Sequence, residues 1–133
     1  MEKKVLSLFA NVGIADLLLE EIGFNVVLAN ELESKRVELL KLNHPNTEVI
    51  CGDIKNKKEE IVIKAISCGV DIIMATPPCQ GMSNAGKKLG SSDLRNYLVL
   101  DALDIIEKVE PKYFIIENVV QQFTTILNMD KPM

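Results

Sequence analysis

The stretch Val70-Asp71-Ile72-Ile73-Met74-Ala75 has the length of a β-strand and is mostly apolar on both of its faces. A strand of this kind is typical of a parallel sheet covered on both sides, because an open sheet surface alternates apolar and polar residues. Similar runs at residues 5–9, 25–29, 48–51 and 112–116 alternate with segments of helical periodicity, around residues 14–22, 34–42, 61–66 and 94–109. The sequence therefore predicts an α/β domain, a parallel sheet with helices on both faces.

The composition fits a single domain of this class. The chain has 133 residues, of which 47% are hydrophobic and 26% are charged, as in ordinary globular domains. No apolar run approaches the roughly 18 residues of a membrane span, and the start lacks a signal-peptide cleavage site, so we expect a cytoplasmic protein. The net charge of −4 is opposite in sign to that of domains that bind nucleic acid mainly through phosphates. If the chain acts on nucleic acid, we expect most of the binding surface to lie elsewhere.

The chain holds three cysteines and one histidine, with no Cys-x-x-Cys spacing. We therefore expect neither a metal site nor a disulfide framework. Cys51 and Cys68 suit a buried structural role, and His44 that of a plain loop residue. Cys79 differs from the other cysteines because it lies among the polar residues of a long loop.

That loop runs for about 18 residues, from Thr76 to Asp93, after the carboxyl end of the strand at 70–75. Open α/β sheets bind their ligands at this end of the strands. Two prolines fix the approach to Cys79, which places its thiol well to act as a nucleophile. Glu117 ends the next strand, and we expect burial at this edge to favour its protonated form. The sequence thus predicts a nucleophile and an acid side by side.

Three motifs in this part of the chain resemble those of the cytosine-5 DNA methyltransferases. They are Pro78-Cys79-Gln80-Gly81-x-Ser83, Asp93-Leu94-Arg95-Asn96-x-Leu98 and Glu117-Asn118-Val119, in the family's order. The resemblance implies a Rossmann-like, S-adenosylmethionine-dependent fold and an enzyme of the restriction–modification type. It implies that Cys79 attacks carbon-6 of a cytosine flipped out of double-stranded DNA, while Glu117 bonds the ring nitrogen and amino group. The implied substrate contacts are Pro78, Gln80, Ser83, Arg95 and Asn118.

The resemblance extends to the binding of S-adenosylmethionine. Residues 9–13, Phe-Ala-Asn-Val-Gly, resemble the family's Phe-x-Gly-x-Gly turn, with Asn11 in place of the first glycine. Asn tolerates left-handed backbone better than most residues, so the turn can survive this change. Glu31 matches the acidic residue that holds the ribose hydroxyls, and Asp53 the one that accepts from the adenine amino group. The implied cofactor-binding residues are Phe9, Ala10, Asn11, Gly13, Glu31, Leu32, Asp53, Ile54 and Pro77.

The resemblance covers essentially residues 1–133, but only the N-terminal part of the family's catalytic domain. We expect the sheet to be incomplete on its C-terminal side, the target-recognition domain to be absent, and the chain to need a C-terminal half or partner subunit. An open edge at residues 112–116 would then favour self-association. Three alternatives stay open: a nucleotide-dependent oxidoreductase, an RNA cytosine-5 methyltransferase relative, and a non-catalytic truncated binding module. The Gly-x-Gly-x-x-Gly motif expected of a nucleotide-dependent oxidoreductase has no good match in this sequence.

Overall fold

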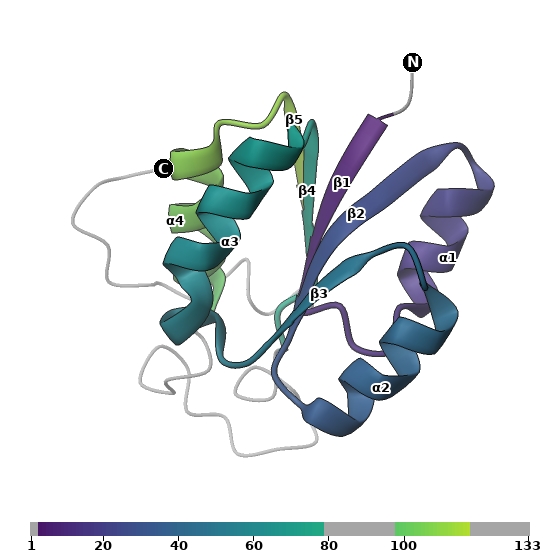
Figure 1. Ribbon diagram of the computed structural model, residues 1–133. Coiled ribbons are helices and arrows are strands. Elements are labelled where there is room, and N and C mark those ends of the chain that lie inside the picture. The colour runs from purple at the N-terminus through teal and green to yellow at the C-terminus, as the bar shows by residue number, and fades with distance from the viewer. Residues whose placement is uncertain (1–2, 79–97, 118–133) are drawn as a thin grey trace.

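The computed structural model describes residues 3–78 and 98–117, in which strands and helices alternate. The elements are β1 (Lys3–Leu8), α1 (Ile14–Glu21), β2 (Phe24–Glu31), α2 (Ser34–Asn43), β3 (Glu48–Cys51), α3 (Ile54–Cys68), β4 (Ile72–Ala75), α4 (Leu98–Val109) and β5 (Tyr113–Ile116) (Figure 1). The described strands form one sheet in the order β3-β2-β1-β4-β5, and every neighbouring pair is parallel. The order reverses direction at β1, which confirms the predicted Rossmann-like α/β fold.

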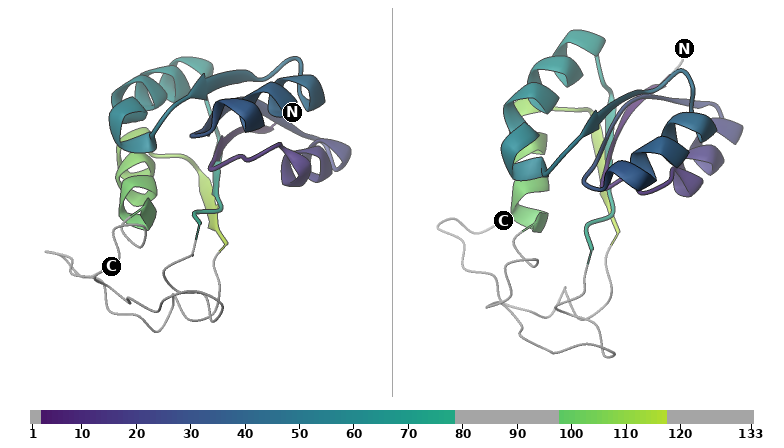
Figure 2. Two further views of the ribbon diagram at one scale, coloured as in Figure 1. Left: turned by 90° about the horizontal axis from the view of Figure 1, so that it is seen from below. Right: turned by 60° about the horizontal axis from the view of Figure 1, so that its bottom comes forward.

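Helices cover both faces of the sheet, with α1 and α2 on one face and α3 and α4 on the other (Figure 2). The alternation of side chains along β1 supplies both layers. Leu6 and Leu8 belong to the larger core, which packs against α3 and α4. Val5 belongs to a smaller cluster on the opposite face, next to Leu19 of α1. The predicted two-layer covering is therefore confirmed.

Helix α3 is longer than its apolar periodicity indicates, because its first turns are charged. It begins after Asp53, whose carboxylate accepts a hydrogen bond from the Lys55 backbone N–H (2.9 Å), an N-cap. The charged residues at the start of the helix also contact the neighbouring helix. Lys55 and Lys58 each lie 3.0 Å from the carboxylate of Asp101 on α4, so they join the two helices.

Expectations about four residues differ from the structure. Cys51 is exposed and Cys68 is half-buried, since the first lies on the edge strand β3 and the second at the end of α3. Glu117 is also exposed, because it follows β5, the last strand of the described sheet. His44, in contrast, is buried with only 3% of its surface exposed.

Within residues 3–78 and 98–117, no helix has the length and apolar character needed to cross a membrane.

Candidate functional site

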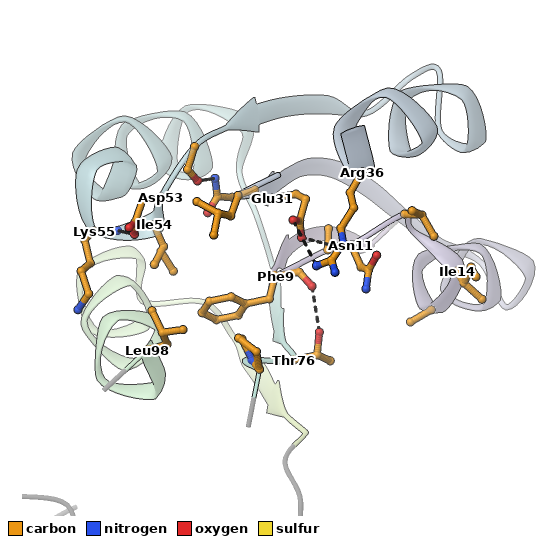
Figure 3. Close-up of a pocket in the computed structure, with 17 residues that line it drawn as sticks. Phe9, Asn11, Ile14, Glu31, Arg36, Asp53, Ile54, Lys55, Thr76 and Leu98 are labelled. Atoms are coloured by element: carbon orange, nitrogen blue, oxygen red, sulfur yellow. Dashed lines mark hydrogen bonds and ion pairs between the residues drawn. The ribbon is translucent and has the colours of Figure 1, made fainter. Parts of the chain in front are cut away.

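A pocket of about 910 Å³ opens at the carboxyl ends of β1, β2, β3 and β4 (Figure 3). This volume lies in the range of small-molecule and cofactor sites, and its place is the switch point of the sheet. Of the predicted cofactor residues, seven line it: Phe9, Ala10, Asn11, Glu31, Leu32, Asp53 and Ile54. Pro78, predicted as a substrate contact, lines it too, whereas Gly13 and Pro77 do not.

The turn after β1 has left-handed backbone at three positions, Phe9 (φ 59°), Asn11 (φ 57°) and Gly13 (φ 82°). Asn11 thus adopts left-handed backbone, which asparagine tolerates better than most residues. The left-handed Phe9 was not predicted. Its carbonyl accepts a hydrogen bond from the Thr76 hydroxyl (3.2 Å), which joins the turn to the end of β4.

Glu31, at the end of β2, is the most constrained carboxylate in the pocket. Only 5% of the residue is exposed. Its Oε1 accepts from the Asn11 backbone N–H and its Oε2 from the Glu33 backbone N–H, both at 2.9 Å. A carboxylate has about four lone-pair directions, so each oxygen can accept one further hydrogen bond. The group is therefore oriented to receive a pair of hydroxyl donors from a ligand.

The other predicted adenosine contacts lie where β3 meets α3. Asp53 uses Oδ1 to cap α3, and the residue lines the pocket. Ile54 is almost fully buried and supplies apolar wall, whereas Leu32 is exposed at the rim. Polar and apolar contacts of this kind suit the edge and the faces of a purine ring.

Nine residues of the pocket lining were not predicted as site residues, among them Asn30, Arg36 and Thr76. Asn30 donates from Nδ2 to the carbonyls of Ile50 (2.8 Å) and Gly52 (3.0 Å), and so holds the end of β3 against β2. Arg36 lies 3.9 Å from Glu31 Oε2 and 3.4 Å from Glu33 Oε2. Asn30 could have been found from the sequence, because it is a polar residue directly before Glu31 in an apolar strand. Nothing in the local sequence marks Arg36.

Of the predicted catalytic pair, the structure places Glu117. Its backbone N–H donates to the Ala75 carbonyl (3.0 Å), so Glu117 lies at the same sheet edge as Thr76, Pro77 and Pro78. Cys79, Gln80, Ser83, Arg95 and Asn118 lie outside the described residues. The pairing of Cys79 with Glu117 therefore stays a prediction.

Comparisons with known proteins identify relatives of the chain. The Type II methyltransferase M1.HgaI of Avibacterium volantium is 39% identical over 127 residues, which cover 90% of this chain and 36% of the relative. M.AquIA, a Type II methyltransferase of Picosynechococcus sp., is 38% identical over 122 residues, or 90% of this chain and 49% of the relative. The structure of a mutant of Spodoptera frugiperda DNMT2 matches with a TM-score of 0.69 and 25% identity, over 92% of this chain and 37% of that one.

The chain thus spans between about a third and a half of the length of these relatives. The family model of the C-5 cytosine-specific DNA methylases matches residues 3–126, nearly the whole sequence. A nucleotide-dependent oxidoreductase is accordingly set aside. With its Rossmann-like sheet, its switch-point pocket and its oriented Glu31, the chain belongs to the C-5 cytosine-specific DNA methylase family.

Proposed function

We propose that this chain is the cofactor-binding N-terminal part of a DNA (cytosine-5-)-methyltransferase of the restriction–modification type. The observation that carries the proposal is the Glu31 carboxylate, buried in the switch-point pocket and oriented by two backbone N–H donors. A vicinal diol such as that of a ribose offers two hydroxyl donors to one carboxylate, which suits this arrangement. The family match supports the same conclusion.

The residues of the pocket fit S-adenosylmethionine as the cofactor. Glu31 would hold the ribose hydroxyls, Asp53 would accept from the adenine amino group through Oδ2, and Ile54 and Leu32 would pack against the ring. When bound, the cofactor supplies a methyl group on a positively charged sulfur. Phe9 and Pro78 line the same pocket and would exclude water there.

The proposed chemistry depends on two residues of the family motifs. Cys79 directly follows Pro78, a residue of the pocket wall. Its thiolate would add to carbon-6 of cytosine, and carbon-5 would gain the electron pair that forms the new bond to the methyl carbon. The bond from that carbon to the cofactor's sulfur would break at the same time, and the sulfur would leave as a neutral thioether. Loss of the carbon-5 proton then expels Cys79 and restores the ring. Glu117 would stabilise the negative charge on the ring through the ring nitrogen and amino group.

Double-stranded DNA, together with the portion of the relatives that has no counterpart here, would be the partners of the chain. Pro78, Gln80, Ser83, Arg95 and Asn118 are the proposed substrate contacts. The base would be flipped out of the duplex, which costs a few kcal/mol of stacking and pairing. Because this chain carries a net charge of −4, attraction to phosphates would have to come from the rest of the enzyme.

Calorimetric titration with S-adenosylhomocysteine tests the cofactor assignment. Glu31→Gln should weaken binding by about tenfold to a hundredfold, because it removes a charged acceptor and places an amide donor against a backbone N–H. Asp53→Ser should also weaken binding while keeping an oxygen that can cap α3. Glu33→Gln is the matched control, since Glu33 pairs with the same Arg36 but does not line the pocket. Absence of binding by the wild-type chain, or equal affinity in Glu31→Gln, would overturn the assignment.

A further inference from the structure

The buried His44 contacts two elements that are distant from it in sequence. It follows the last residue of α2, and its Nε2 lies 2.7 Å from the carbonyl oxygen of Gly13, at the start of α1. Its Nδ1 contacts Glu20 Oε1 at the other end of α1. In Figure 1, α2 lies beside α1, which brings the end of α2 to the turn that precedes α1. His44 therefore joins α2 to both ends of α1.

Both partners of the His44 ring nitrogens are oxygen atoms that accept hydrogen bonds. A carbonyl oxygen only accepts, so Nε2 must carry the hydrogen in the contact with Gly13. The contact of Nδ1 with Glu20 is an ion pair when the ring carries both protons. Besides Glu20, the carboxyl of Asp16 faces this charge: burial raises the pKa of Asp16, while the hydrogen bond from Ser7 and the charge on His44 lower it.

The neighbouring residue Asn43 holds the same turn. Its Nδ2 donates to the carbonyl oxygen of Val12 (2.6 Å). Consecutive residues at the end of α2 thus bind the consecutive carbonyls of Val12 and Gly13. The fit is close, since a Cβ on Gly13 would lie 2.6 Å from a carbon of the His44 ring.

The turn held by these two residues is a wall of the pocket. Val12 lines it, and Asn11 donates its backbone N–H to Glu31 Oε1 from the same turn. The position of that N–H, and with it the orientation of the Glu31 carboxylate, depends on where the Val12 and Gly13 carbonyls are held. Neither Asn43 nor His44 lines the pocket.

We propose that Asn43 and His44 are positioning residues for the cofactor site. The inference rests on the proposed cofactor function of the pocket. The two side chains hold the turn through their hydrogen bonds to the carbonyls of Val12 and Gly13. Cofactor affinity should therefore fall when either donor is removed.

Variants at His44 separate the two hydrogen bonds. His44→Gln keeps a donor near the place of Nε2, and so the bond to Gly13, whereas His44→Phe keeps a ring without any donor. We expect His44→Phe and Asn43→Ala to weaken S-adenosylhomocysteine binding about tenfold. His44→Gln should bind within a few-fold of the wild type, because it keeps the donor to Gly13.

Thr47→Val is the matched control. Thr47 also follows α2 and donates its hydroxyl to a backbone carbonyl, but to Val26 of β2 (2.6 Å) rather than to the turn. It should lower the melting temperature as the other variants do, and leave the affinity unchanged. A loss of affinity in Thr47→Val equal to that in His44→Phe would reduce His44 to a general structural role and overturn the proposal.

The amide signals of the turn give a second measurement that needs no ligand. The signals of Asn11 and Gly13 in ¹H–¹⁵N spectra should move in His44→Phe and stay near their wild-type positions in His44→Gln and Thr47→Val. Wild-type binding, with turn signals that do not move in His44→Phe, would overturn the positioning role alone. Turn signals that move in His44→Phe, without any binding by the wild type, would support the hold of His44 on the turn and overturn the cofactor assignment instead.

Discussion

Asp16 shows how one buried residue sets part of the pH dependence of folding. Only 1% of Asp16 is exposed; its Oδ1 accepts from the Ser7 hydroxyl (2.9 Å), and its Oδ2 has no hydrogen-bond partner in the described part of the chain. Burial raises the pKa of this carboxyl above its ordinary value of 3.8, more than the Ser7 hydrogen bond lowers it. The folded protein therefore holds the proton to higher pH than the unfolded chain does. Stability from this group falls as the pH rises from about 3.8 through the raised pKa.

We predict that Asp16→Asn stabilises the protein at pH 7, because a neutral amide avoids the cost of a buried charge and can still accept from Ser7. The melting temperature should rise by a few degrees, and the gain should shrink as the pH is lowered towards 4. Asp104→Asn is a control of opposite sign, since the hydrogen bond from Lys58 lowers the pKa of Asp104. Thermal unfolding of both variants across this pH range checks the pair. A lower melting temperature for Asp16→Asn at pH 7 would contradict the prediction.

At the scale of the element, two glycines with left-handed backbone cap helices in different surroundings. Gly69 ends α3 (φ 72°) with open space where a Cβ would stand. Gly13 precedes α1 (φ 82°), and a Cβ there would lie 2.6 Å from both the His44 ring and the Leu40 side chain. The first position requires glycine for its backbone alone, and the second for its backbone and its neighbours.

We predict that Gly69→Ala costs about 1 kcal/mol of unfolding free energy and leaves cofactor binding unchanged. Gly13→Ala should cost about 1–3 kcal/mol more, because the methyl group displaces packed side chains. It should also weaken S-adenosylhomocysteine binding, since the turn that moves is a wall of the pocket. Urea unfolding and calorimetry on both variants measure the two effects. Equal losses of stability in the two variants would contradict this prediction, because they would show that the side chains around Gly13 move aside at no cost.

The strands and helices could be predicted from the sequence where the signal is local, since apolar runs mark the five strands. The site could be predicted where residues resemble a family motif, as they do in the turn after β1, at Glu31 and at Asp53. The interactions that bury His44 do not, because its partner Gly13 lies 31 residues away and Asn43-His44-Pro45 has the composition of a loop. The exposure of Cys51 depends on β3 being an edge strand, which only the order of the sheet reveals.

At the scale of the whole molecule, we predict that the 133 residues alone do not methylate DNA and that they do so once the remainder of the enzyme is supplied. The chain spans at most about half of the relatives it matches, and its net charge of −4 offers no attraction for phosphates. Transfer of a labelled methyl group to mixed-sequence DNA, with and without the remainder, measures this. An RNA substrate in parallel tests the remaining alternative. Robust transfer by the chain alone, or restored transfer that survives Cys79→Ala, would refute the scheme.

We also predict that the chain associates with itself through the edge of β5. β5 is an edge strand of the described sheet, and Tyr113, Phe114 and Ile115 are exposed on it. An apolar edge with unpaired backbone groups favours pairing with another chain. Sedimentation velocity at increasing concentration checks this, with Ile115→Lys expected to keep the chain monomeric.

The central place of β1 has a consequence for how the chain is made. β1 is synthesised before the other described strands, yet one of its edges pairs with β4, and the contacts between Lys4 and Asp71 close over 67 residues. At about 5–20 residues per second, a ribosome needs roughly 3–13 s to make that distance. During this interval the nascent strand has a partner in β2 on one side and an open parallel edge on the other. Slow codons between β2 and β4 would lengthen this exposure and favour aggregation, whereas fast ones there would raise the yield of folded protein.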